Sequence, residues 1–298
     1  MKITWSVLIL TLILSACTSP APVATPTLAP DPSTKRSGSY FGEPLPGDEP
    51  VQFGKGFLNG SYHSSPVFSP DGNTAWWAGS FSSATIYTSQ VVDGHWSKPG
   101  KIEFSDEIKS YRDPFISPDG SKFYFITTAA LPGESSGGKE NIWMMEKQGD
   151  DWGEPQPLPD VVNALKLHWT VSVANNLNLY FSAEDRGKAD IYLSRYVNGN
   201  YQEPVLLDAP INTDTIEFTP NIAPDESYIL FSRLADNNSP AYLYISYATE
   251  AGWSEPQKVE NVTNCISPII TPDRQYLLYM DGPSILYWRD TSFIEALQ

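Results

Sequence analysis

Short apolar runs separated by polar turns recur along most of the chain. The runs are dense in aromatic and β-branched residues, as in KFYFIT at 122–127 and YILFSR at 228–233. Short runs of this composition, bounded by Gly, Pro, Asn and Asp, are typical of β-strands rather than helices. The hydrophobic pattern therefore predicts an all-β domain.

One turn motif returns at intervals of roughly fifty residues, a period typical of repeat folds. Its proline fixes φ for the first corner of a tight turn, its Asp caps the backbone two residues on, and Gly or Asn takes the left-handed corner. An apolar run precedes each copy and another follows it, so each copy predicts a β-hairpin. The five copies align on Asp71, Asp119, Asn175, Asp225 and Asp273.

A second motif, an aromatic residue followed three positions later by proline, closes each unit after a third apolar run and a polar turn. Its copies begin at Phe41, Trp96, Trp152, Tyr201 and Trp253. Each unit thus holds about four strands and buries both its faces only by stacking against its neighbours, which predicts a β-propeller. A β-sandwich is the alternative, but it does not account for two linked motifs.

The two motifs are out of phase by one copy. Phe41 has no turn motif before it, and Asp273 has no aromatic motif after it. Five blades can form a closed ring only if the two ends of the domain share one blade. We therefore predict a five-bladed β-propeller of four-stranded blades, in which residues 40–50 supply the N-terminal strand that completes the last blade. Closure of this kind removes the exposed sheet edges that would promote aggregation.

The segments FSPDGNTAWW, ISPDGSKFYF and IAPDESYILF resemble the WD-like SPDG repeats of TolB-type β-propellers. The resemblance runs from Gly42 to the C-terminal residues and so covers nearly all of the predicted domain. It implies a bacterial propeller of the secreted or lipidated group. It is specific for the fold and weak for function, because one fold hosts many activities.

The N-terminus adds a targeting segment. Lys2 precedes a short apolar run, and LSAC at 14–17 resembles the bacterial lipoprotein signal, which implies cleavage before Cys17 and lipidation of that residue. An ordinary secretory peptide is the alternative. The resulting boundaries are a signal peptide at 1–16, a tether rich in Pro, Ser and Thr at 17–38, and the propeller at 39–298. Thr18 after the cysteine implies a cell-envelope lipoprotein on the outer membrane, facing the periplasm or the cell surface.

Charge narrows the choice of partners. The formal net charge of −16 in 298 residues argues against nucleic acid, which requires a basic surface. It also argues against a basic membrane-binding face. We expect membrane attachment through lipidated Cys17, an envelope protein or a glycan as partner, and a monomeric chain.

The candidate site lies where the innermost strands begin, because that end of a propeller channel gathers residues from every blade. Polar and titratable residues concentrate there, which is typical of a ligand pocket. Their alternative role is structural, as paired or solvated groups at a water-filled mouth. The ligand-binding candidates are His63, Tyr111, Arg112, Asp113, His168, Trp169 and Glu217.

An enzyme hypothesis competes with the binding one. The segment YRDPFISPDG resembles the Arg-Asp-Pro motif of five-bladed glycosidases of the arabinanase and xylosidase type. That resemblance implies Asp113 as the carboxylate that tunes the site and Glu217 as the general acid. The third carboxylate of the pattern is missing, because Ser65 stands at its position. A carbohydrate-active enzyme with its site at the axis is therefore the alternative to a binding module.

Other chemistry is not indicated. Three His, scattered along the chain, predict no metal site, although His63 and His168 could meet across the channel. No phosphate-binding loop or nucleophile elbow is present, so no cofactor is expected. Cys265 is expected to be a small buried residue; a reactive thiol would need His63 or His168 beside it. The sequence thus predicts a lipid-anchored envelope propeller that binds a protein or glycan.

Overall fold

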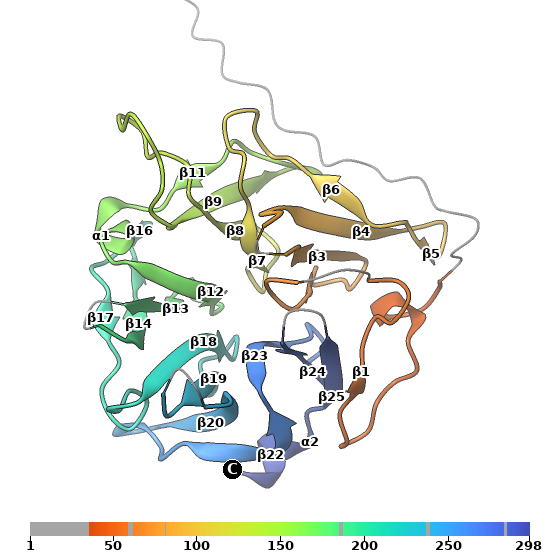
Figure 1. Cartoon of the computed structure of the whole chain (residues 1–298), viewed down its shortest axis with the longest axis vertical. Coiled ribbons are helices and arrows are strands. Elements are labelled where there is room, and N and C mark those ends of the chain that lie inside the picture. Colours follow the sequence, from red (N-terminus) through yellow and green to blue (C-terminus); the bar gives the residue numbers. More distant parts are fainter. Residues whose placement is uncertain (1–35, 59–61, 81, 185–186, 237–238, 283–284) are drawn as a thin grey trace, which may run out of the picture.

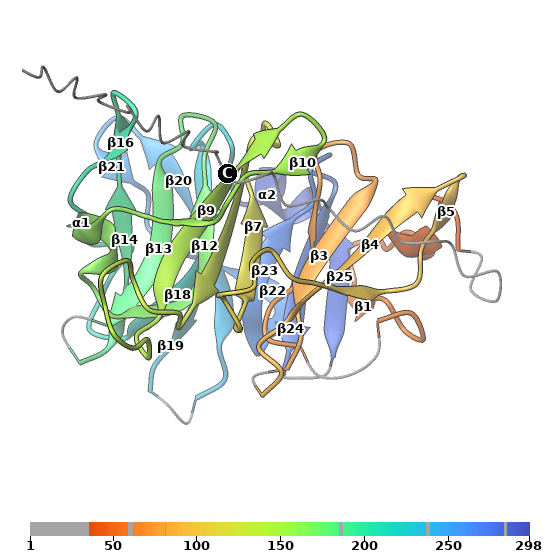
Figure 2. The same ribbon diagram turned by 90° about the horizontal axis from the view of Figure 1, so that it is seen from above.

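Five antiparallel sheets stand around a central axis, as the view down that axis shows (Figure 1). The structure is a computed structural model that describes residues 36–58, 62–80, 82–184, 187–236, 239–282 and 285–298, with the side chains of residues 167–169 outside the description. The turned view shows the strands running from one face of the ring to the other (Figure 2). This arrangement confirms the predicted five-bladed β-propeller.

Each sheet is one blade, and its first three strands follow chain order from the axis outward in blades 1 to 4. Blade 1 contains β2 (Val67–Phe68), β3 (Thr74–Ala78), β4 (Ile86–Val92), β5 (His95–Trp96) and β6 (Gly100–Ile102). Blade 2 contains β7 (Arg112–Ile116), β8 (Lys122–Thr127), β9 (Asn141–Gln148), β10 (Asp151–Trp152) and β11 (Gln156–Pro157).

The remaining blades repeat this plan. Blade 3 contains β12 (Leu167–Val173), β13 (Leu179–Glu184), β14 (Ala189–Ser194) and β17 (Val205–Leu206), with β15 (Tyr196–Val197) and β16 (Asn200–Tyr201) as a separate hairpin. Blade 4 contains β18 (Ile216–Ile222), β19 (Tyr228–Leu234), β20 (Tyr242–Thr249), β21 (Gly252–Trp253) and β22 (Gln257–Thr263). Blade 5 contains β23 (Cys265–Ile270), β24 (Tyr276–Asp281), β25 (Leu286–Asp290) and β1 (Val51–Gln52).

The part of the chain that the structure describes contains few helices, and all of them are short. They are the 3-10 turn η1 (Tyr40–Gly42), α1 (Asp160–Asn163) and α2 (Ser292–Ala296). In the described ranges none of them has the length and apolar character needed to cross a bilayer. The core instead consists of apolar side chains packed between neighbouring sheets. One such cluster joins Trp76 and Ile86 of blade 1 to Phe123 and Trp152 of blade 2.

The turn motif forms the hairpin between the first two strands of a blade, as predicted. In blade 2 the Asp119 carboxylate accepts hydrogen bonds from Ser117 Oγ at 2.6 Å and from the Ser121 backbone N–H at 3.0 Å. These bonds satisfy the turn backbone, and Gly120 takes the left-handed corner with φ of 72°. The third copy of the motif was aligned one residue too early. Asn176, not Asn175, accepts the corresponding N–H, from Asn178 at 3.0 Å.

Four innermost strands share a second irregularity, a register shift with one left-handed residue. These residues are Asp113, Thr170, Thr219 and Ser267, with φ between 47° and 57°. A left-handed L-residue is strained, and a β-bulge bends a strand and increases its twist. Because the bulge recurs at one repeat position, it belongs to the architecture of the channel wall. Every one of these four residues carries a side-chain oxygen.

Strand β1, from the N-terminal part of the described chain, lies beside β25 in blade 5, which confirms that an N-terminal strand closes the ring (Figure 1). The closing strand is β1, in which Val51 pairs with Trp288 and Gln52 with Tyr287. It therefore lies just after residues 40–50, where we predicted it. Residues 40–50 do not form the closing strand themselves because the aromatic side chains of this segment pack in the core between blades 5 and 1.

Phe41 is fully buried and lies against rings from three parts of the chain. Its ring centroid is 4.7 Å from those of Phe57 and Trp96 and 5.5 Å from that of Phe68. Trp96 also donates its backbone N–H to Arg36 O at 2.7 Å. The N-terminal segment thus wedges between blades 5 and 1 before it supplies β1.

Candidate functional site

The central axis has two mouths. The strand-start mouth is the end at which the innermost strands begin, next to His63, Arg112 and Glu217. The hairpin mouth is the opposite end, at which these strands turn back beside Pro70 and Pro118. The sequence placed the candidate residues at the strand-start mouth.

His63 and Asp113 meet at that mouth. His63 Nδ1 lies 2.7 Å from Asp113 Oδ1, and both side chains are almost completely buried. Burial alone would lower the pKa of His63, but the adjacent Asp113 carboxylate outweighs it and raises that pKa. The left-handed backbone at Asp113 aims its carboxylate from blade 2 at the histidine of blade 1. The pair therefore links two blades.

Arg112 lies beside this pair and contacts Glu140, a residue that the sequence gave no reason to select. Arg112 Nη1 is 3.3 Å from Glu140 Oε1. Burial raises the pKa of Glu140, and the nearby Asp113 carboxylate raises it further, while Arg112 and His63 act in the opposite direction. Four titratable groups from three segments thus form one charged cluster.

Glu217 belongs to a separate network. Its Oε1 accepts hydrogen bonds from Thr213 Oγ1 at 2.7 Å, Thr215 Oγ1 at 2.6 Å and Arg233 Nε at 3.0 Å. Its Oε2 lies 3.7 Å from Lys188 Nζ. The side chain is completely buried. Pairing of β18 with β19 sets Arg233 directly opposite Glu217, so a correct strand register would have revealed this partner.

The other sequence-based candidates are dispersed. The Tyr111 hydroxyl, which is buried, bonds the backbone of its own loop at Phe104 and Ser105. Cys265 is buried, and burial raises the pKa of its thiol, which makes it a poor nucleophile. The side chains of His168 and Trp169 lie outside the described part of the structure, as does Cys17. Among the described residues there is no group of three or more His, Cys, Asp or Glu that could hold a metal ion.

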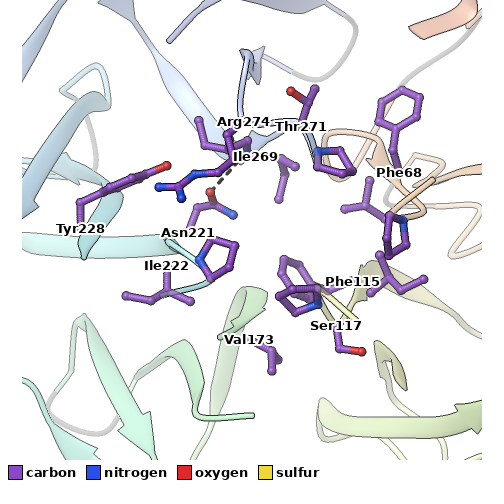
Figure 3. A pocket seen from close by; sticks show the side chains of 17 residues that line it. Phe68, Phe115, Ser117, Val173, Asn221, Ile222, Tyr228, Ile269, Thr271 and Arg274 are labelled. Carbon is purple, nitrogen blue, oxygen red and sulfur yellow. Dashed lines mark hydrogen bonds between the residues drawn. The ribbon is translucent and has the colours of Figure 1, made fainter. Parts of the chain in front are cut away.

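The hairpin mouth contains a pocket that the sequence analysis did not anticipate (Figure 3). Its volume is about 300 Å³, at the lower end of the range for ligand pockets. All five blades contribute to it, so it lies on the propeller axis. The lining consists of Val67, Phe68, Pro70, Phe115, Ile116, Ser117, Pro118, Val173, Asn221, Ile222, Pro224, Tyr228, Ile269, Ile270, Thr271, Pro272 and Arg274.

Most of this lining is apolar, and most of its polar side chains are already bonded. Ser117 and Thr271 donate to the turn residues Asp119 and Asp273. Asn221 differs from these two, because its Oδ1 accepts the Ile270 N–H at 3.3 Å and its amide nitrogen points into the pocket (Figure 3). The sequence contains a signal for this polar position in the pocket. Asn221 stands where the aligned copies in blades 1, 2 and 5 have Val, Phe and Ile.

Fold and site define a five-bladed β-propeller with an axial pocket. No protein-family model matches the chain, and a search of curated proteins found no match. Among solved structures it is similar to a protein described as TolB from Agrobacterium tumefaciens, at 15% identity, with a TM-score of 0.51 and 76% of each chain covered.

Two further solved structures match with lower TM-scores. The nidogen/laminin complex matches at 9% identity with a TM-score of 0.47, covering 67% of this chain and 68% of that one. The tricorn protease matches at 15% identity with a TM-score of 0.47, covering 75% of this chain and 24% of that one. At such identities the similarity shows the fold alone. The resemblance to TolB-type propellers is supported as structural similarity, and family membership stays a prediction.

Proposed function

We propose that the protein is a binding module that holds a partner protein at the hairpin mouth of its propeller. The observation that supports this is the axial pocket, which is open, apolar and built from all five blades. When a partner's apolar side chain fills this cavity and excludes water from it, the free energy of the complex falls. The rigid ring keeps this cavity formed before the partner arrives.

A protein fits this pocket better than a glycan. Sugars present many hydroxyl groups, and each needs a polar partner when it is buried. The pocket offers Phe115, Ile116 and Ile270 as surface and few unengaged polar side chains. The partner is therefore expected to insert an apolar side chain.

The enzyme alternative has less support from the geometry. A glycosidase mechanism needs carboxylates that can donate a proton or activate water next to the substrate. Asp113 is bonded to His63, and both oxygens of Glu217 have partners on its own blade or its neighbour. These groups act as links within the ring in our proposal.

The cell envelope is the proposed location. The LSAC segment at 14–17 supports lipidation of Cys17, and the composition of 17–38 supports a tether that holds the ring away from the membrane. Loss of membrane association in a Cys17→Ala variant, measured by fractionation, would support this part of the proposal.

Binding by the pocket can be tested with peptides. A displayed random peptide library is selected on the protein, and the dissociation constants of the selected peptides are measured for Phe115→Ser and Ile270→Ser. These half-buried residues come from blades 2 and 5. We expect each change to weaken binding at least tenfold, since buried apolar area is lost.

Val205→Ser is the matched control, because Val205 is exposed on the outer strand of blade 3. It should leave the dissociation constants unchanged, and circular dichroism should show that all variants fold. Unaltered affinity in both pocket variants would contradict the proposal. Pocket-dependent binding on a glycan array would favour the glycan alternative instead.

A further inference from the structure

Exposed aspartates surround the hairpin mouth. Each one directly follows a proline that lines the pocket, because both belong to the turn motif. They are Asp71, Asp119, Asp225 and Asp273. In three of them, Asp71, Asp119 and Asp225, hydrogen bonds from the turn outweigh burial and lower the carboxyl pKa. These groups therefore remain ionised at neutral pH.

The lining of the axial pocket contains little positive charge. Arg274 is the one charged side chain among the described residues that line the pocket. Its Nη1 lies 3.5 Å from Asp225 Oδ2, and its guanidinium is 5.8 Å from the centre of the Tyr228 ring. Asp225 thus offsets this charge locally. Three aspartates of the rim remain, in a protein whose formal net charge is −16.

The pocket inside this rim offers two kinds of contact. Its floor and walls are apolar, as the side chains of Val173, Ile222 and Phe115 illustrate (Figure 3). Asn221 is 5% exposed and has no described partner for its amide nitrogen, which points into the cavity (Figure 3). An N–H donor that faces a pocket in this way matches a carbonyl oxygen.

We propose that the hairpin mouth binds a segment of a partner protein in which one apolar side chain is flanked by Lys or Arg. The apolar side chain fills the pocket, a backbone carbonyl of the segment accepts the Asn221 amide, and the flanking cations face the aspartates of the rim. This inference rests on the proposed function. It adds that the charges of the rim aspartates select a segment with flanking Lys or Arg. Such complementarity favours fast encounter and excludes acidic competitors.

The turn chemistry allows the rim charge to be removed without loss of the turns. Asn176 occupies the aspartate position in blade 3 and accepts the same backbone N–H. The triple variant Asp71→Asn, Asp119→Asn, Asp273→Asn should therefore keep its hairpins. The control triple Glu107→Gln, Glu134→Gln, Asp208→Asn changes the net charge equally, in exposed links at the opposite face of the ring.

The probes are four acetylated and amidated pentapeptides, KKFKK, SSFSS, EEFEE and KKSKK. Dissociation constants are measured by isothermal titration calorimetry at low and at raised salt. We expect KKFKK to bind at least tenfold more tightly than SSFSS, and EEFEE to bind most weakly. Salt should reduce this preference because it screens exposed charges. The rim triple variant should abolish the preference, and the control triple should retain it.

The outcomes separate the two proposals. Equal binding of KKFKK, SSFSS and EEFEE, still sensitive to Phe115→Ser, would overturn the charge inference and leave the binding module standing. Equal binding of KKFKK and KKSKK would mean that charge acts without the pocket, which would overturn this inference and count against the proposed function. If the control triple variant also loses the preference for KKFKK, net charge and not the rim is responsible. That result would likewise overturn the charge inference.

Discussion

Single residues at the strand-start mouth show how far sequence can identify a charged cluster. Repeat alignment was enough to bring His63, Arg112, Asp113 and Glu217 to one end of the channel. It could not show that His63 bonds Asp113 while Glu217 bonds Arg233, because pairing depends on side-chain directions across blades. The left-handed backbone at Asp113 sets one such direction and has no clear trace in the local sequence.

The bond between His63 and Asp113 predicts a pH-dependent contribution to stability. Because the pKa of His63 is raised in the folded chain, this contribution is complete below the unfolded value of about 6.5 and is lost as pH rises through the folded value. Asp113→Asn should lower the free energy of unfolding by about 3–5 kcal/mol in acid, as expected when a buried pair loses one partner. Asparagine also tolerates the left-handed backbone.

Urea unfolding at pH 5.5 and at pH 8.5 measures this effect. The loss in Asp113→Asn should be larger at pH 5.5. Exposed Asp150→Asn serves as control and should show no such difference. A loss that is equal at both pH values would mean that the charge on His63 does not contribute.

At the scale of the element, the hairpins were the best-predicted parts of the chain. Proline, aspartate and glycine act locally in a turn, so their order indicates the turn without knowledge of the fold. Blade 3 was misaligned by one residue because it has consecutive asparagines, Asn175 and Asn176, in place of Pro and Asp. The axial pocket was missed because it forms only when five such turns converge, and no single turn encodes it.

Two hairpin glycines predict graded effects. Gly72 and Gly120 have φ of 71° and 72°, so alanine at either position should cost about 1–2 kcal/mol for the left-handed backbone. A Cβ at Gly72 would meet nothing within 4 Å, whereas one at Gly120 would lie 3.2 Å from Pro70 Cγ. Gly120→Ala should therefore destabilise the protein more than Gly72→Ala.

Urea denaturation of both variants tests this order. Equal free energies of unfolding for the two variants would show that the contact with Pro70 relaxes without cost and would contradict this order. Because Pro70 lines the axial pocket, Gly120→Ala should also change peptide affinity more than Gly72→Ala does.

For the whole molecule, counting two motifs along the sequence was enough to predict five blades and a closed ring. The count could not place the closing strand, because the aromatic motif at Phe41 does not act as the motif does elsewhere. Trp96 and Trp152 each lie in a short outer strand of their own blade, whereas Phe41 fills a gap between two blades. Phe41 lies at the junction of blades 5 and 1 because its ring fills the space between their side chains.

Deletion of residues 36–52 should destabilise the entire ring. It removes β1 and the buried ring of Phe41, whose truncation to alanine alone is expected to cost about 3–5 kcal/mol. For a domain of this size we expect the melting temperature to fall by roughly 10 °C or more. Deletion of 18–34, which lies within the tether predicted from composition at 17–38, should leave the melting temperature unchanged. An equal change in both variants would contradict the role of the closing segment.

The pairing of β1 with β25 also sets an order of events during synthesis. Val51 is made early, but its partner Trp288 belongs to the last blade and is made only after the other four blades. Contacts between such distant positions form slowly and only after the intervening chain is complete. The ring therefore stays open until β25 of the last blade is available to pair with β1, and the four earlier blades wait without their closing contact.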